Sequence, residues 1–255
     1  MFKTVLVKMC LTSLLVCFST GLCQSNDNEP DEYGQWMAKP QSEWPQITMI
    51  NQIEYTDNNH PIAGCGFLLD TGDEVLAATA KHILIYFKSD SMKTVSFDNT
   101  LKLWKMFPKD NPDDVVVVGE LINENKEELL GEAPTGQDWL LFTLKKRSQN
   151  IQPLKLRSSP MQEGETVYII GWRYSDKDCP QVIYEGNFVR SEEGSFLITT
   201  KELEDNTMPG LSGSPVIDSR GYLLGLMSQK AEKMERPSST DYPKMLIGRR
   251  TNAKE

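Results

Sequence analysis

The sequence is poor in histidine, one of the residues that most often bind transition metals, and its charge is mainly negative. It holds two histidines and five cysteines among 255 residues, and they lack the close spacing of metal ligands. We therefore expect no metal and no cofactor. Asp and Glu outnumber Lys and Arg by 36 to 27, for a net charge of −9. Because gripping a phosphate backbone requires clustered Lys and Arg, we expect no nucleic-acid partner.

Long hydrophobic runs are also absent. The apolar stretch at residues 9–18 covers about half of the length that a membrane-spanning helix requires, and no later segment is long enough, so we expect no membrane-spanning segment. Lys3 and Lys8 come before this stretch, and small residues and then polar sequence follow it. This pattern is typical of a signal peptide, which we place at residues 1–23. The chain is therefore predicted to be exported, as a secreted or periplasmic protein.

Cysteine usage fits export. Three cysteines lie in or beside the signal segment, which leaves Cys65 and Cys179 in the folded part of the chain. An oxidising compartment permits a disulfide between these two, but their separation along the chain does not establish that they meet, and the pairing stays open. Cys23 is a candidate for lipid attachment. Leu22 is bulky where a lipoprotein signal has a small residue, so soluble export is favoured over a lipid anchor.

Little of the sequence has helical periodicity. After a polar stretch at residues 24–43, which we expect to be a flexible leader, apolar runs of β type alternate with turn sequences. About a dozen such runs favour an all-β sandwich or barrel. A polar stretch at residues 145–153 ends in proline and separates the halves, which we place at 44–146 and 153–248. The candidates for helix are residues 123–130 and 230–236.

The stretch "GLSGSPV" places Ser212 between Gly210 and Gly213. A serine hydroxyl is a weak nucleophile unless a base lies within hydrogen-bond reach and backbone N–H groups stabilise the oxyanion that forms. A glycine at 210 lets its own N–H and that of Ser212 point at one spot, and Gly213 keeps the space beside the hydroxyl open. Taken alone, the segment also fits a β-turn with a solvated serine.

The stretch "VLAATAKHIL" places a candidate base, His82, at the end of a β-type run. Small residues before a histidine let the backbone pass close to other elements while the imidazole projects into a cleft, where it can take a proton from a serine. The other histidine, His60, lies in the polar turn "DNNHP" and fits a residue without a chemical role.

The stretch "GQDWLLFTLKK" places Asp138 at the start of a strongly apolar strand. A buried anion is costly without a partner. A histidine is a suitable partner, because the carboxylate can accept a hydrogen bond from its far ring nitrogen and so hold the imidazole in the required tautomer. Asp110, Asp113 and Asp114 lie in a proline-containing acidic loop and are more simply explained as solvated turn residues.

These three segments, in the chain order His, Asp, Ser, resemble the signature segments of chymotrypsin/trypsin-like serine peptidases. The resemblance spans residues 44–230, and the sequence Ser-Gly-Ser-Pro is similar to bacterial members such as the glutamyl endopeptidases. It implies two antiparallel six-stranded β-barrels, at 44–146 and 153–248, with the active site between them. His82 and Asp138 would come from the first barrel and Ser212 from the second.

The resemblance also implies the role of each residue. Ser212 would attack the scissile carbonyl of a protein or peptide substrate, His82 would act as base and then acid, and Asp138 would orient His82. Gly210 and Ser212 would supply the N–H groups of the oxyanion hole. Ser228 would lie where the backbone contacts an extended substrate, which binds partly as an added strand.

The sequence departs from the family pattern at several positions. Leu211 stands where zymogen-activated members have an aspartate, so that activation switch is not expected. Lys81 stands before the histidine where alanine is usual. The residues around Ser228 lack the histidine of glutamyl-specific members, so the resemblance does not support a preference for acidic side chains. Asn206 and Thr207 are expected near the specificity pocket.

The sequence therefore predicts an exported serine endopeptidase that works through a Ser-His-Asp triad and an acyl-enzyme intermediate. One alternative is a catalytically inactive domain of the same fold whose cleft binds a protein or peptide, which Leu211 and Lys81 keep open. The other is an unrelated β-sandwich adhesion or cell-envelope module.

Overall fold

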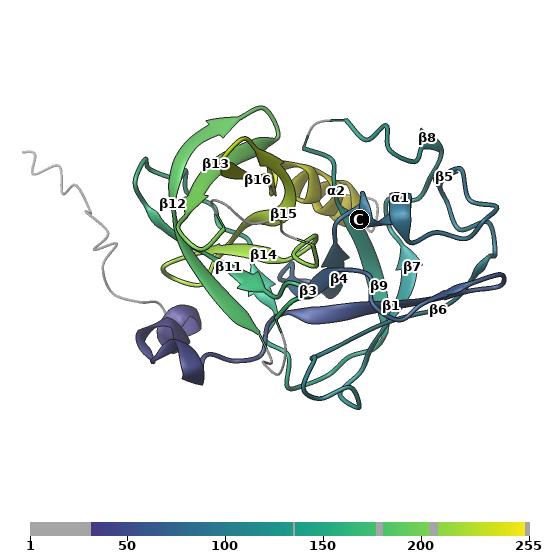
Figure 1. Ribbon diagram of the computed structural model, residues 1–255, viewed down its shortest axis with the longest axis horizontal. Helices are drawn as coiled ribbons and strands as arrows, with labels where there is room; N and C mark the ends of the chain where they lie inside the picture. Colours follow the sequence, from purple (N-terminus) through teal and green to yellow (C-terminus); the bar gives the residue numbers. More distant parts are fainter. Residues whose placement is uncertain (1–31, 135, 177–180, 204–208, 253–255) are drawn as a thin grey trace, which may run out of the picture. The chain divides into compact units, whose positions relative to one another are not determined.

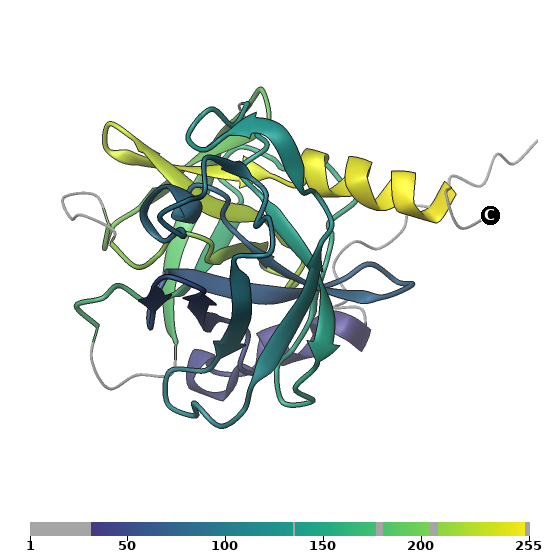
Figure 2. The ribbon, with the colours of Figure 1, turned by 90° about the vertical axis from the view of Figure 1, so that its right-hand side faces the viewer.

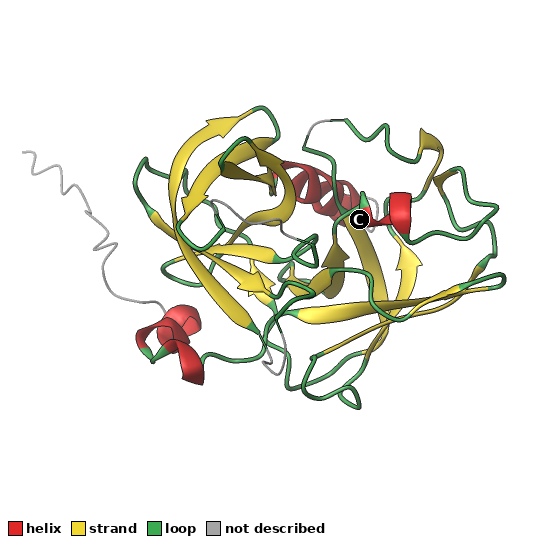
Figure 3. Cartoon of the chain, in the orientation of Figure 1, coloured by secondary structure: helices red, strands yellow, loops and turns green. Residues whose placement is uncertain are grey.

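The computed structural model describes residues 32–134, 136–176, 181–203 and 209–252, all within one compact unit. Strands dominate it, with a few short helices and one longer one (Figure 3). The predicted signal peptide at residues 1–23, Cys23, Cys179, Asn206 and Thr207 lie outside the described residues. In the described part of the chain, no helix has the length and apolarity needed to cross a membrane.

The first half of the chain forms a closed β-barrel of antiparallel strands, drawn in blue and teal in Figure 1. Round the barrel the strands are β3 (Cys65–Asp70), β4 (Val75–Thr79), β9 (Leu140–Lys146), β7 (Val116–Leu121), β6 (Leu101–Phe107) and β1 (Met49–Tyr55). Pairing of β1 with β3 closes the barrel. Two short strands, β2 (Asn59–His60) and β10 (Leu154–Lys155), extend the sheet, and β5 (Thr94–Val95) pairs with β8 (Asn125–Leu129) beside it.

The second half forms another closed barrel, in green and yellow in Figure 1. Its strands, in order round the barrel, are β11 (Thr166–Gly171), β12 (Val182–Glu192), β13 (Ser195–Thr200), β16 (Met234–Ser239), β15 (Leu223–Ala231) and β14 (Pro215–Asp218). The prediction of two six-stranded antiparallel barrels is confirmed. The alternative of a β-sandwich is wrong.

The cores follow from the apolar runs of the sequence. Side chains of alternate strand residues point to the same face, so each run sends its apolar positions into a barrel. The first barrel is filled by large rings that are fully buried, including Phe67, Trp104, Trp139 and Phe142. The second has a smaller core, which includes Val167, Ile169, Phe196 and Val216. Burial of these groups is the main force that closes the barrels.

The predictions of helix at residues 123–130 and 230–236 are both wrong. Residues 125–129 form β8, which pairs with β5, and residues 230–236 form the end of β15, a two-residue turn and the start of β16. Helix propensity in a polar segment such as "NENKEELL" is a weak preference, and pairing with a neighbouring strand overrides it. The helices are instead η1 (Glu32–Ala38), η2 (Gln41–Glu43), α1 (Ile83–Tyr86) and α2 (Asp241–Asn252).

The helix α2, yellow in Figure 2, follows the last strand of the second barrel but packs on the hydrophobic cluster that fills the first. Tyr242, Leu246 and Ile247 contact that cluster, and the Arg250 guanidinium pairs with Glu74 at 3.2 Å. The end of the chain is thereby tied back to the β3–β4 turn.

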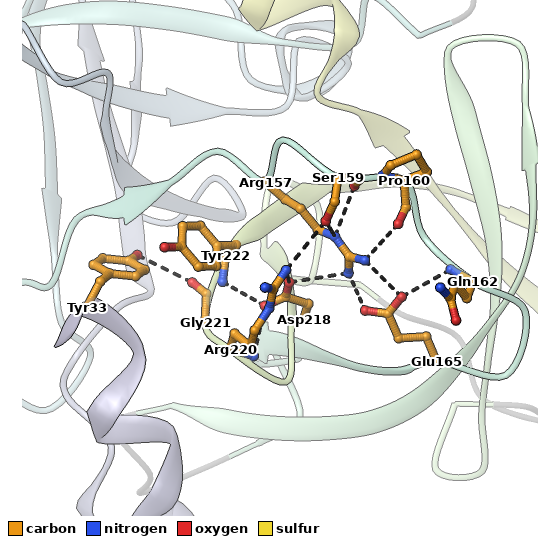
Figure 4. A network of polar contacts seen from close by, with 10 residues as sticks. All are labelled: Tyr33, Arg157, Ser159, Pro160, Gln162, Glu165, Asp218, Arg220, Gly221 and Tyr222. Carbon is orange, nitrogen blue, oxygen red and sulfur yellow. Dashed lines mark hydrogen bonds and ion pairs between the residues drawn. The ribbon is translucent and has the colours of Figure 1, made fainter. Parts of the chain in front are cut away.

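Residues 32–43 belong to the segment expected to be a flexible leader, yet they form η1 and η2 and pack against both halves of the molecule. The Trp36 ring lies edge-on to Trp44 at 5.3 Å, and Trp44 lies edge-on to Tyr168 at 5.2 Å. The hydroxyl of Tyr33 accepts a hydrogen bond from the N–H of Lys155 at 2.9 Å, and its ring packs on Tyr222 (Figure 4). Aromatic side chains therefore hold this part of the predicted leader against the barrels.

The connection between the barrels is fixed by a buried guanidinium, that of Arg157 (Figure 4). It pairs with Glu165 and, at 3.2 Å, with Asp218, and it donates to the carbonyl of Pro160 at 2.8 Å. Burial alone would raise the pKa of Glu165, but hydrogen bonds from Arg157 and from the N–H of Gln162, with the charges of Arg157 and Arg220, together outweigh burial and hold that pKa below its usual range. Two carboxylates on one buried cation keep the start of the second barrel in place.

Candidate active site

Strand register brings His82 and Asp138 together. The strands β4 and β9 pair antiparallel, with Thr79 opposite Leu140. Continuing this register past the end of β4 sets Lys81 opposite Asp138, and the N–H of Lys81 donates to the carbonyl of Asp138 at 3.3 Å. Lys81 and His82, just after the end of β4, and Asp138, just before the start of β9, therefore share one end of the first barrel.

The carboxylate of Asp138 holds His82 at two points. Its Oδ1 accepts the backbone N–H of His82 at 2.7 Å, and its Oδ2 lies 2.7 Å from Nδ1 of the imidazole. A carboxylate in this position favours the tautomer with the proton on Nδ1, which leaves Nε2 free to accept a proton. Asp138 is buried while His82 is partly exposed, so the imidazole reaches from the protein interior toward solvent.

Ser212 completes a row with these two residues. Its Oγ lies 2.7 Å from Nε2 of His82, on the side of the ring away from Asp138. The serine comes from the loop before β14, in the second barrel, so the row joins the two barrels. The structure thus places the three candidate catalytic side chains within hydrogen-bond distance of one another, in the order Ser212, His82, Asp138.

Two glycines let the Ser212 loop lie against the first barrel. The carbonyl of Ser212 accepts the N–H of Cys65 at 2.8 Å. A Cβ at Gly213, which has φ +83°, would overlap the carbonyl of Cys65, and a Cβ at Gly64 would come within 2.7 Å of the carbonyl of Ser212. Since only glycine permits both the positive φ and this approach of the backbones, Gly213 is required by the contact between barrels as well as by the serine turn.

The backbone N–H groups of Gly210 and Ser212 have no hydrogen-bond acceptor among the described residues. Gly210 has φ +109°, and a Cβ there would come within 2.7 Å of the N–H of Tyr174. Leu211, between the two, is buried in the core of the second barrel. The apolar side chain therefore anchors the loop where an aspartate would need a charged partner.

Cys65 is a free, buried cysteine. Its Sγ lies 3.2 Å from the carbonyl of Gly210, directly under the serine loop. Burial raises the pKa of the thiol to about 11, so Cys65 is protonated at neutral pH. A protonated, inaccessible thiol is not a nucleophile, so this cysteine packs the loop.

Ser228 contributes a contact that sequence reasoning did not foresee. Its Oγ donates to Oδ2 of Asp138, the oxygen that also faces Nδ1 of His82. The resemblance to serine peptidases implies only backbone contacts with substrate at Ser228. The hydroxyl adds a further hydrogen-bond donor to the buried carboxylate of Asp138.

A buried ion pair beside the histidine was also missed. The ammonium of Lys81 lies 2.6 Å from Oε1 of Glu128 on β8, with side-chain exposures of 4% and 11%. The ring of Tyr242 on α2 lies 5.5 Å from the same ammonium. The sequence signal was present, because a lysine inside an apolar run requires a partner, but nothing along the chain identified Glu128 as that partner.

Next to His82 and Asp138 lies a cavity of about 380 Å³. Its walls come from both barrels, including residues from α1, from the loop after β8 and from β15 and β16. His60 takes no part in the cavity or the row, and its imidazole packs edge-on against the rings of Tyr55 and Phe87. Lys230 on β15 donates to the carbonyl of Leu203 at 2.8 Å and does not line this cavity.

Comparison with solved structures supports the assignment of the fold. A serine endoprotease from Yersinia pestis matches with a TM-score of 0.53 and 15% identity, over 86% of this chain and 68% of that one. A protease from M. tuberculosis in its active form matches with a TM-score of 0.52 and 12% identity, over 80% of each chain. At these identities the likeness concerns the fold. No curated protein matches the sequence.

Two closed six-stranded barrels that meet beside a Ser-His-Asp row define the class of trypsin-like folds. A family model, described as the trypsin-like peptidase domain, matches residues 64–226. The matched region is more than half of the chain, and the protein belongs to this family of peptidases.

Proposed function

We propose that this protein is an exported serine endopeptidase that cleaves peptide bonds through an acyl-enzyme intermediate. The row of hydrogen bonds from Ser212 through His82 to Asp138, with both steps at 2.7 Å, is the observation that carries the proposal. A serine, a histidine and a buried carboxylate in this order are the groups that acyl transfer to serine requires. The apolar stretch at residues 9–18, preceded by lysines, supports export.

In the first half of the reaction, Ser212 Oγ attacks the scissile carbonyl while its proton passes to Nε2 of His82. Asp138 stabilises the imidazolium that forms. The N–H groups of Gly210 and Ser212, which lack acceptors among the described residues, stabilise the oxyanion of the tetrahedral intermediate. The intermediate collapses when His82 returns the proton to the leaving amine, and the acyl group stays on Ser212.

In the second half, water replaces the amine. His82 takes a proton from the water as it attacks the ester, and then returns that proton to Ser212 as the acid product leaves. The substrate lies along the backbone at Ser228 as an added strand. Leu211 is packed in the second barrel, so we infer that the row is assembled in the folded chain without capture of a new N-terminus.

A fluorophosphonate probe tests the proposal, because it reacts with a serine only when that serine is activated. We expect wild-type protein to gain the mass of one adduct at Ser212, and the Ser212→Ala variant to gain none. Ser191→Ala, which removes an exposed serine of β12, is the matched control and should label as the wild type does. Folded wild-type protein that takes up no probe would contradict the proposal and favour a domain that binds peptides without cutting them.

A further inference from the structure

The cavity beside His82 has one apolar wall and one polar wall. Ile85, Tyr86 and Leu130 line the side that belongs to the first barrel. Gln229, Arg236 and Ser238 line the side that belongs to the second barrel. Gln229 on β15 is paired with Arg236 on β16, so their side chains lie on the same face of the sheet. A substrate held at Ser212 would therefore meet an amphipathic pocket next to the reacting groups.

The polar wall carries excess positive charge. The guanidinium of Arg236 pairs with Glu192 at 3.1 Å, and the guanidinium of Arg190 pairs with the other oxygen of the same carboxylate at 3.0 Å. Two cations thus share one anion. The side chain of Arg236 is 37% exposed and lines the cavity, whereas Arg190 does not line it. The two guanidinium groups and the one carboxylate together carry one excess positive charge, and Arg236 is the member of this group that lines the cavity.

The other charged groups at the cavity already have hydrogen-bond partners within the protein. Lys81 is paired with Glu128, and Asp138 faces His82. The polar wall also holds unused donors, because Nε of Arg236 and Oγ of Ser238 are buried and have no hydrogen-bond partner among the described residues. Buried donors without partners cost free energy, so the polar wall is not fully satisfied by contacts among the described residues.

We propose that this cavity receives an acidic side chain of the substrate, and that Arg236 determines the preference. The inference rests on the proposed peptidase function, which it extends to a substrate class. The carboxylate would pair with the guanidinium in a charge-assisted hydrogen bond, while the methylene groups of a glutamate would contact Ile85 and Leu130. The residues around Ser228 include no histidine for this purpose, and the cation comes instead from the next strand, β16.

The test compares peptides and variants. A peptide library digested by the wild type should show Glu or Asp enriched at one position near the scissile bond. For two peptides that differ only by Glu or Gln at that position, we expect kcat/KM to be about 10-fold higher for the Glu peptide. This is the effect of one hydrogen bond between charged groups that are partly exposed. Arg236→Met, which keeps the length of the side chain, should bring this ratio close to one. Arg236→Lys should retain part of it, and Arg190→Met, which also releases Glu192 but lies outside the cavity, should change it less than about twofold.

A binding measurement separates this inference from the proposed function. The affinities of the Glu and Gln peptides for the Ser212→Ala variant, with and without Arg236→Met, do not depend on catalysis. Wild-type protein that labels with fluorophosphonate but shows no acidic preference, or an Arg236→Met variant that keeps the preference, would overturn the inference alone. A preference in binding that depends on Arg236, in a protein that takes up no probe, would support the inference and reject peptidase activity.

Discussion

The buried pair of Lys81 and Glu128 gives the sharpest stability prediction. Replacing Lys81 with methionine leaves the Glu128 carboxylate almost fully buried with its cation gone. At 2.6 Å the Coulomb attraction of the pair is about 6 kcal/mol for an effective dielectric constant of ~20. Desolvation of both ions offsets much of that attraction, and removing one partner of such a pair typically costs about 3–5 kcal/mol. We expect Lys81→Met to lose this amount, a large part of the ~5–15 kcal/mol that stabilises a typical domain.

The same substitution should reach the active site, because His82 is the next residue along the chain. The backbone N–H of Lys81 donates to Asp138, and its side chain is held between Glu128 and the ring of Tyr242. Urea unfolding followed by tryptophan fluorescence measures the free energy of unfolding. Fluorophosphonate labelling of the folded variant measures whether Ser212 is still activated by His82 and Asp138. The double variant Lys81→Met with Glu128→Leu replaces the pair by apolar groups and should recover much of the lost stability.

A matched control lies on the same strand. Lys126 on β8 pairs with Asp98 at 3.2 Å, but the two side chains are 72% and 60% exposed. Lys126→Met should therefore change the free energy of unfolding by less than about 1 kcal/mol. The reasoning is refuted if Lys81→Met costs no more than this control, or if the double variant loses the sum of the two single losses, since either result would mean that the buried charges do not depend on each other.

Two further predictions concern single side chains. Ser228→Ala removes a hydrogen-bond donor to Asp138. We therefore expect kcat to fall about 10-fold with little change in KM, and the free energy of unfolding to fall by about 1.5–3 kcal/mol. An unchanged kcat in a normally folded variant would show that the hydroxyl does not position the carboxylate. Burial raises the pKa of Glu235 in the folded protein above its value of about 4.3 in the unfolded chain. The wild type therefore loses stability as the pH rises from about 4.3 through the pKa of Glu235 in the folded protein. Glu235→Gln should therefore be more stable than wild type in urea unfolding at pH 7 and lose this advantage below about pH 4, and a variant that is less stable at pH 7 would contradict the argument.

The sequence predicted the strands and the candidate triad because both are local. Apolar runs of period two mark a strand without reference to its partner, and His82, Asp138 and Ser212 each lie in a short segment with its own signature. The pairing of strands is different, because the contact of β1 with β3 or of α2 with the first barrel depends on chain packing that no local pattern encodes. For the same reason the polar run at residues 123–130 favoured a helix, although pairing with β5 makes it a strand.

Contacts that join distant segments explain what was missed at the site. Lys81 is a charged residue in an apolar run, which indicates that it has a partner, but that partner, Glu128, is 47 residues away along the chain. Arg236 carried no signal, since an arginine on a strand is ordinarily a solvated residue. Its place in the cavity follows only from the pairing with Gln229 and from the carboxylate of Glu192 that it shares with Arg190. Residues that tune a site are harder to find than those that do its chemistry, because their own sequence segments look ordinary.

The alignment of the row depends on main-chain contacts between the barrels as much as on its side chains. The carbonyl of Ser212 is hydrogen-bonded to the N–H of Cys65 at 2.8 Å, and Gly213 allows the loop to lie against the carbonyl of the same residue. His82 and Asp138 are fixed to the first barrel by the register of β4 and β9. A serine placed by the second barrel alone would follow every small movement between the barrels. Because its own backbone is bonded to the first barrel, its hydroxyl stays within reach of the imidazole, which is the condition that proton transfer imposes.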